Sequence, residues 1–217
     1  MDGFTGLNPA EAKANIDAFV NAMNEVAMIF LNGGNALFGN LRETWCSPRA
    51  VEFGDKYSYV LYDSTFTAIK DAAMLIARNA ETAYNTISIA NGGGYLGANY
   101  GSQPVPSIQG YFGNLNETGT SGIVGMNLMQ VQLALVVYGE AVEKGLNALA
   151  AVPTNIAFYD PNGEQQATYK AEIEKVKNNL EETINSMLDE IEAAMETEQN
   201  SLILAKESAT DALSGTA

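Results

Sequence analysis

Acidic residues occur as adjacent pairs in this chain, and paired carboxylates are groups that carry general acid and base chemistry or bind a metal ion. Glu181 and Glu182 form one pair, and Asp189 and Glu190 form another. Both pairs lie on the polar side of a long amphipathic pattern, so we interpret them as a solvated helix face rather than a hydrolytic site. Residues 160–164 have the types found in part of a calcium loop, but the further oxygen ligands are missing.

Other catalytic chemistries are excluded by residue type. The chain has no His and a single Cys, Cys46, which excludes His-based acid and base catalysis, Cys–His nucleophiles and ordinary zinc sites. The glycines at 92–94 lead into no Gly-Lys-Ser or Gly-Lys-Thr sequence, so they indicate a flexible linker and not a phosphate loop. We therefore expect a protein that is not an enzyme, with no catalytic residue, no cofactor and no metal.

The charge balance limits the partners. The net charge is −15, and residues 111–217 hold 16 Asp or Glu against 5 Lys or Arg. So acidic a surface disfavours nucleic acids and anionic membranes and favours solubility. The most apolar run, residues 123–138, is too short and too polar to span a bilayer. The first residues lack the basic segment of a signal peptide, so we expect a protein that is cytoplasmic before export and then secreted or held at the cell surface by a non-classical route.

Four long helices are predicted from apolar residues at spacings of three and four. The first begins after Asn8, a good N-cap, and runs to about residue 41, with Gly33 and Gly34 predicting a kink or a close helix crossing. The second begins at Ser47-Pro48 and ends near residue 91, where three glycines follow. The third spans about 121–150. The fourth follows a break at 153–163, with a coiled-coil-like seam of Ile173, Val176, Leu180, Ile184, Met187, Ile191 and Ala194 and a frayed end over 208–217.

These elements predict an all-α fold in which two long antiparallel helical hairpins form a four-helix bundle. Residues 1–90 make the first hairpin, and residues 123–217 make the second, with its acidic C-terminal helix. Between them, residues 91–122 form a Gly/Asn-rich linker or loop. We expect this insert to cover a helix poorly because it is so rich in Gly and Asn.

The two hairpins carry related turns. Trp45-Cys46-Ser47-Pro48 and Phe158-Tyr159-Asp160-Pro161 each read aromatic, any residue, N-cap residue, Pro, and such a tetrapeptide starts a helix. The distance from Asn8 to Trp45 equals the distance from Ser121, the predicted start of the third helix, to Phe158. The halves are therefore predicted to be structurally equivalent.

The first turn resembles that of a known family. Trp45, Ser47, Pro48, Ala50 and Phe53 match the turn and second-helix start of the Trp-x-Gly (ESAT-like) proteins, with Ser47 at the position where Gly is usual. The resemblance implies a helix, a turn and a second antiparallel helix, pairing into a four-helix bundle, and export by a type VII secretion system. It covers residues 8 to about 90, whereas the second half matches in architecture, with Phe158 in place of Trp.

One departure from the family concerns its export signal. That signal is often Tyr-x-x-x-Asp/Glu just after the second helix, and here the only match in spacing is Tyr59 to Asp63, inside the second helix. Export by that route would then depend on a partner that carries the signal.

The third helix carries two apolar stripes where a bundle helix needs one. The first stripe faces the bundle, and the second comprises Met126, Met129, Leu133 and Val136. We expect this second stripe to contact a protein partner or a second copy, with the secretion machinery as a further candidate partner. The leading interpretation is an exported or export-linked interaction protein, secreted or on the cell surface. The alternative is a structural subunit of a phage or injection particle or of a surface filament.

Overall fold

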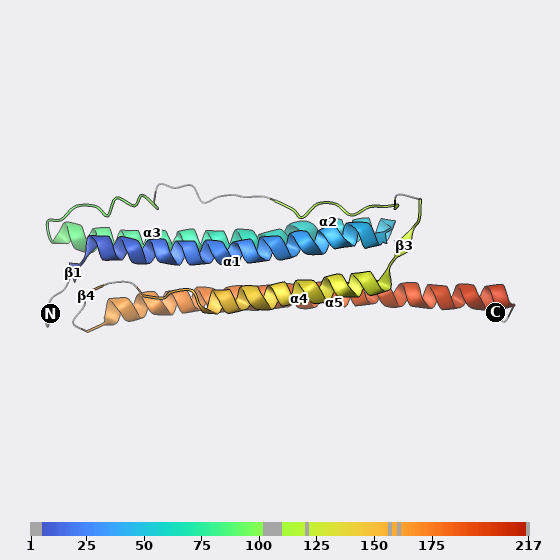
Figure 1. Ribbon diagram of the computed structural model, residues 1–217. Helices are drawn as coiled ribbons and strands as arrows, with labels where there is room; N and C mark the ends of the chain where they lie inside the picture. The colour runs from blue at the N-terminus through green and yellow to red at the C-terminus, as the bar shows by residue number, and fades with distance from the viewer. Residues whose placement is uncertain (1–5, 102–109, 120–121, 156–157, 160–161, 216–217) are drawn as a thin grey trace.

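The computed structural model describes residues 6–101, 110–119, 122–155, 158–159 and 162–215, with only the backbone of residues 158 and 159. The predicted all-α fold is confirmed, and the helices lie side by side as an elongated bundle (Figure 1). The helices are α1 (Pro9–Thr44), α2 (Pro48–Tyr62), the π-helix η1 (Asp63–Thr67), α3 (Ala68–Ala90), α4 (Leu128–Ala150) and α5 (Glu164–Ser214). Four strands of two residues each join them: β1 (Gly6–Leu7), β2 (Trp45–Cys46), β3 (Gly125–Met126) and β4 (Phe158–Tyr159).

The first hairpin folds as its capping residues predict. The Asn8 side chain accepts hydrogen bonds from the backbone N–H groups of Ala10 and Glu11, and the Ser47 hydroxyl accepts one from Ala50 at 3.0 Å. The returning arm was predicted as one helix, but the π-helix η1 divides it into α2 and α3. A π turn inserts an extra residue into the helical repeat, so it resets which face α3 turns to the core.

Glycines let α1 and α4 approach closely. A Cβ on Gly33 would lie 2.9 Å from the Cβ of Ala141, and a Cβ on Gly145 would overlap the ring of Phe30. The predicted close crossing at Gly33 is therefore present, and α1 is one uninterrupted helix through it. The two hairpins meet across this contact, and most of the buried core lies between them.

The second hairpin departs from the sequence prediction at its start. Helix α4 begins at Leu128, not near residue 121, and Asn127 caps it by accepting a hydrogen bond from the N–H of Gln130. Gly125 has an extended φ of 159° and pairs with β2 as part of β3, so the apolar residues just before α4 do not join the helix. At the other end of α4, the ammonium group of Lys177, a residue buried on α5, donates to the carbonyl of Ala150 at 2.8 Å. A cation there stabilises the helix C-terminus.

Helix α5 is longer than predicted. It has 51 residues against 23 in α4, and it remains helical to Ser214, so the prediction of a frayed end from residue 208 is wrong. Its last residues project past the end of the bundle (Figure 1). Every residue from Leu202 to Gly215 is exposed, and we call residues 200–214 the overhang.

The insert between the hairpins covers helices, contrary to expectation. Its described part runs back along the outer side of the first hairpin (Figure 1). Phe112 and Leu115 are buried there, and Cβ atoms on Gly34 and Gly54 would collide with the first and crowd the second. The N–H of Phe112 donates to the hydroxyl of Ser58 at 2.7 Å. Small helix residues thus make room for the two large side chains of the insert.

A buried carboxylate holds the first part of the insert. Glu81 accepts hydrogen bonds from the N–H of Asn99 at 2.7 Å and of Gly101 at 3.0 Å. Between them, the hydroxyl of Tyr100 donates to Asp17. Partial burial raises the pKa of Asp17, but hydrogen bonds from Lys13 and Tyr100 outweigh it, so the pKa lies below its ordinary value. We call the described residues of this insert, 91–101 and 110–119, the strap.

The glycine contact between α1 and α4 can be tested on one helix. Gly145→Ala should lower the free energy of unfolding by about 1–3 kcal/mol, because the new methyl group overpacks the core against Phe30. Gly139→Ala is the matched control: nothing lies within 4 Å of its Cβ position, so it should be neutral or stabilise by up to about 1 kcal/mol. Chemical denaturation measures both. Equal effects of the two changes would contradict the close crossing.

Candidate functional site

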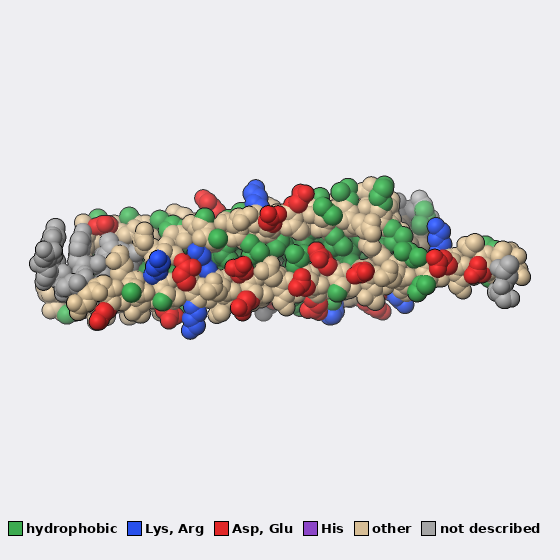
Figure 2. Space-filling view, turned by 90° about the horizontal axis from the view of Figure 1, so that it is seen from below, with side chains coloured by type: hydrophobic (Ala, Val, Ile, Leu, Met, Phe, Trp, Pro, Cys, Tyr) green, Lys and Arg blue, Asp and Glu red, His purple; other side chains and the backbone are tan. Residues whose placement is uncertain are grey.

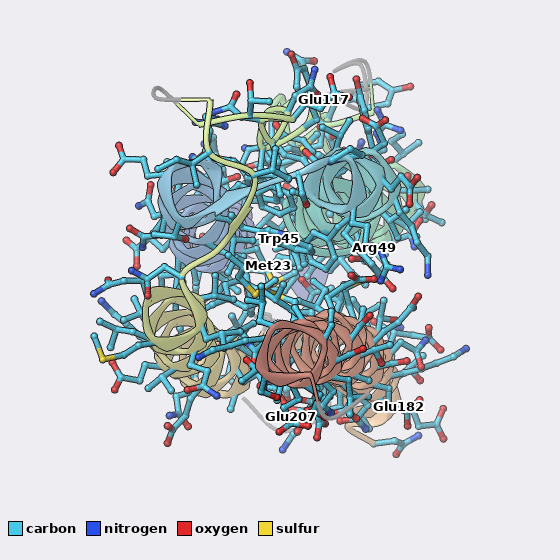
Figure 3. The ribbon with its side chains drawn as sticks, turned by 90° about the vertical axis from the view of Figure 1, so that its right-hand side faces the viewer. Met23, Trp45, Arg49, Glu117, Glu182 and Glu207 are labelled. Carbon is cyan, nitrogen blue, oxygen red and sulfur yellow. The ribbon has the colours of Figure 1, made fainter. Side chains whose placement is uncertain are left out.

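Trp45 lies buried at the bend of the first hairpin. It is 2% exposed, and its ring centroid lies 5.2 Å from that of Phe53 on α2. Phe53 in turn lies 4.7 Å from the ring of Tyr57 and 6.4 Å from that of Phe38 on α1. Figure 3, which looks along the bundle from this end, shows Trp45 pointing between the two hairpins. Trp45 and Phe53 of the turn motif therefore pack in the core, and Trp45 touches both hairpins.

The backbone around Trp45 joins the two hairpins. Strand β2 pairs antiparallel with β3, which places Trp45 opposite Met126 and Cys46 opposite Gly125. The N–H of Asn127 donates to the carbonyl of Thr44 at 2.8 Å, so the N-cap of α4 is bound to the end of α1. On the other side of β2, the N–H of Ser47 donates to the carbonyl of Asn116 at 3.0 Å. One short strand thus binds the start of the second hairpin and the end of the strap.

The opposite end of the bundle has an equivalent joint. Strand β1 pairs antiparallel with β4, with Gly6 opposite Tyr159 and Leu7 opposite Phe158. In both joints a glycine lies opposite the second residue of the turn, and the apolar residue after it lies opposite the aromatic one. Each hairpin therefore binds the turn of the other through the residues just before its own first helix.

The sequence signal for this equivalence was misread. Ser121 lies outside the described residues and does not start α4, and Asn127, the true N-cap, stands 31 positions before Phe158 whereas Asn8 stands 37 before Trp45. The better signal is the pair of tripeptides that end in these caps, at residues 6–8 and 125–127. The second turn also differs: α5 begins at Glu164, three positions after Pro161, while Asp160 and Pro161 lie outside the described residues.

The second stripe of α4 faces away from the core. Met129 is 70% exposed, Leu133 53% and Val136 58%. These three residues lie on the side of the helix opposite Val131 and Tyr138, which are buried. Figure 2 shows the α4–α5 side of the bundle, with hydrophobic side chains gathered along its middle and acidic ones beside them.

Met126 does not belong to the exposed stripe. It lies in β3, half-buried, and packs against the core cluster beside Trp45. The reason is that the residues before Leu128 are extended, so they do not continue the helical face that the sequence pattern suggested. We therefore define the outer stripe of α4 as Met129, Leu133 and Val136.

Two hollows flank the Trp45 joint. A groove of about 290 Å³ has Trp45, Met126 and Leu202 in its walls, and Arg49 crosses to α5 there, at 3.0 Å from Glu198. A wider pocket of about 900 Å³ is lined by Arg42, Cys46 and Asn116 among others.

Metal binding and membrane spans are two further features to consider within the described residues. Within those ranges, no group of three or more Asp, Glu, His or Cys is arranged to hold a metal ion. In the same part of the chain, no helix is long and apolar enough to cross a membrane. No family model, no curated protein and no solved structure matches this chain.

Removing the Trp45 side chain should destabilise the whole bundle. Trp45→Ala should lower the free energy of unfolding by about 3–5 kcal/mol, because the cavity opens between the two hairpins. Trp45→Phe, which keeps a ring beside Phe53, should cost clearly less. Thermal melting and denaturant unfolding of the three proteins provide the comparison. A Trp45→Ala protein that melts like the parent would contradict the role assigned to this residue.

Proposed function

We propose that this chain is a non-enzymatic interaction protein, a fused pair of Trp-x-Gly-like hairpins that bundles internally and presents the outer stripe of α4 to a protein partner. The observation that carries the proposal is the exposure of Met129, Leu133 and Val136 on the face of α4 opposite the core. Contiguous exposed apolar side chains on a folded domain are typical of contact sites.

The strap supports this choice of surface. Its described part lies over the first hairpin and away from α4 (Figure 1). There it buries Tyr100, Phe112 and Leu115, so the chain covers the outer side of the first hairpin with its own residues. The outer stripe receives no such cover from the described part of the strap, so it is open to a partner.

The pattern along α4 supports a contact of limited length. The outward positions are apolar from Met129 to Val136 and become charged at Glu140, Glu143 and Lys144. An amphipathic partner helix would lie across the first two turns and end near these charges. The buried Trp45 turn and the paired joints fit a fused Trp-x-Gly pair, in which one chain supplies both hairpins of the bundle.

Export is part of the same proposal. The chain would be made in the cytoplasm and then secreted or held at the cell surface by a type VII route. Tyr59, the one residue with the spacing of the family's export motif, stacks on Tyr111 of the strap at 4.9 Å between ring centroids. We infer that a bound partner supplies the signal to the secretion machinery. The alternative, a structural subunit of a particle or filament, is favoured by the overhang of α5, which suits repeated contacts between copies.

The test removes the outer stripe and keeps the fold. In a variant with Met129→Glu and Leu133→Glu, both side chains are exposed, so the melting temperature should stay near that of the parent. Tagged parent and variant are used to retrieve the binding partner from source cells, and we expect the partner with the parent only.

The matched control carries Leu75→Glu and Ile89→Glu, two exposed apolar residues on α3. It should retain the partner as the parent does. Retrieval of the same partner by the stripe variant, or its loss from the control, would contradict the proposed surface.

A further inference from the structure

The buried seam of α5 continues beyond the end of the bundle. Within the bundle, Ile184, Ile191 and Met195 are buried at spacings of seven and four. The same rhythm of three and four goes on in the overhang, at Leu202, Ala205, Ala209 and then Ala212 and Leu213. At about 100° per residue these positions fall on one face of the helix, in line with the buried ones. All are exposed, and Leu213 is 91% exposed.

The overhang begins at an apolar hollow. The groove of about 290 Å³ at its base is lined by Trp45, Val124 and Met126 from the joint and by Leu202 and Ala205 from α5 itself. The groove is large enough for one leucine side chain. The groove therefore links the core to the seam face of the overhang, although its wall also holds the ion pair of Arg49 and Glu198.

We propose that the overhang pairs antiparallel with the overhang of a second copy, about a two-fold axis near residue 207. This register places Leu202 opposite Ala212 and Leu213 of the other copy, and Ala205 opposite its Ala209. Leucines then close both ends of the contact, and alanines at its centre allow the helices to approach closely. Leu213 of each copy reaches the groove beside Trp45 of the other.

The charges of the overhang favour a second copy as the occupant. The chain carries a net charge of −15, but the overhang holds only Lys206, Glu207 and Asp211. Glu207 and Asp211 lie on the side of the helix away from the seam, so neither carboxylate of the overhang is buried in the contact. The carboxylate at the groove, Glu198, is paired with Arg49 at 3.0 Å. The two Lys206 side chains flank the seam on the same side and reach solvent. Repulsion between two acidic molecules and between these lysines is screened by salt, so the dimer should tighten as ionic strength rises.

The contact is small. Stable interfaces bury about 800 Å² on each partner, and two helical segments of this length bury less. We therefore expect a concentration-dependent dimer rather than an obligate one, and sedimentation equilibrium of the full chain from micromolar to millimolar concentration will show monomer and dimer. Leu213→Glu should weaken the dimer by about tenfold or more, because a carboxylate would replace a buried leucine.

Leu204→Glu is the matched control. Leu204 is 64% exposed and lies on the opposite side of the same overhang, so the change should leave the dimer within about twofold of the parent once the added charge is screened by salt. A parent that stays monomeric throughout, a dimer that withstands Leu213→Glu, or equal loss with Leu204→Glu would each overturn the proposal.

Cysteine cross-linking tests the antiparallel register of the two overhangs. In a Cys46→Ala background, chains carrying Ala205→Cys are mixed with chains carrying Ala209→Cys and oxidised, and a disulfide-linked heterodimer is expected. Chains carrying Leu204→Cys in place of Ala205→Cys should not cross-link, and cross-linking there would overturn the antiparallel register. The outer-stripe variant with Met129→Glu and Leu133→Glu should still dimerise, which separates this contact from the proposed partner surface on α4.

Discussion

The close approach of α1 and α4 is the contact on which the arrangement of the other elements depends. Gly33 faces Ala141, and Gly145 faces Phe30, so two helices from different hairpins meet at a distance that larger side chains would prevent. Helix α5 has no comparable contact with α4, and two ion pairs, Arg49 with Glu198 and Lys56 with Glu190, lie between it and α2. Such exposed ion pairs contribute little to the free energy of unfolding, so they do not determine how the helices align. Packing between the hairpins, more than packing within the second one, therefore determines the fold.

The two short-strand joints bind the two hairpins to each other at both ends of the bundle. Each turn pairs with the residues just before the first helix of the other hairpin, in the same register at both ends. Backbone hydrogen bonds join the hairpins at both ends of the bundle, so they fix the position of one hairpin along the axis of the other. Side chains in the core need not prevent such a shift. Two separate chains would have to find this arrangement by association, whereas here a single chain carries both halves. The strap, which lies between the halves in the sequence, packs onto the first hairpin and adds Phe112 to the aromatic cluster around Phe38.

The helices and their caps could be predicted because they depend on local features: periodic apolar residues, Asn8, Ser47 and the prolines that follow them. The partnership of Trp45 with Phe53 was also predictable from the turn. The start of α4 was not, because the apolar residues before Leu128 fit a helical stripe as well as an extended segment, and the left-handed and extended glycines that decide between them carry no periodicity. The length of α5 was underestimated because its small residues were taken as a sign of fraying, although Ala is the strongest helix former. The strap was missed because Tyr100, Phe112 and Leu115 find their places through glycines far away in the sequence, such as Gly34 and Gly54.

The distribution of charge explains how the protein tolerates exposed apolar side chains. Exposed stripes promote non-specific association, and a large net charge opposes it at long range. In this chain most of the negative charge is in the second half, the half that carries the outer stripe and the overhang. Two copies therefore repel each other unless complementary apolar surfaces come into contact. Salt screens this repulsion and leaves the shape of the apolar surfaces unchanged. A partner without this acidic excess meets less repulsion than a second copy does. The long-range repulsion between copies would thereby favour a different protein on the proposed outer stripe, and the proposed pairing of overhangs would depend on a close apolar match at the end of α5.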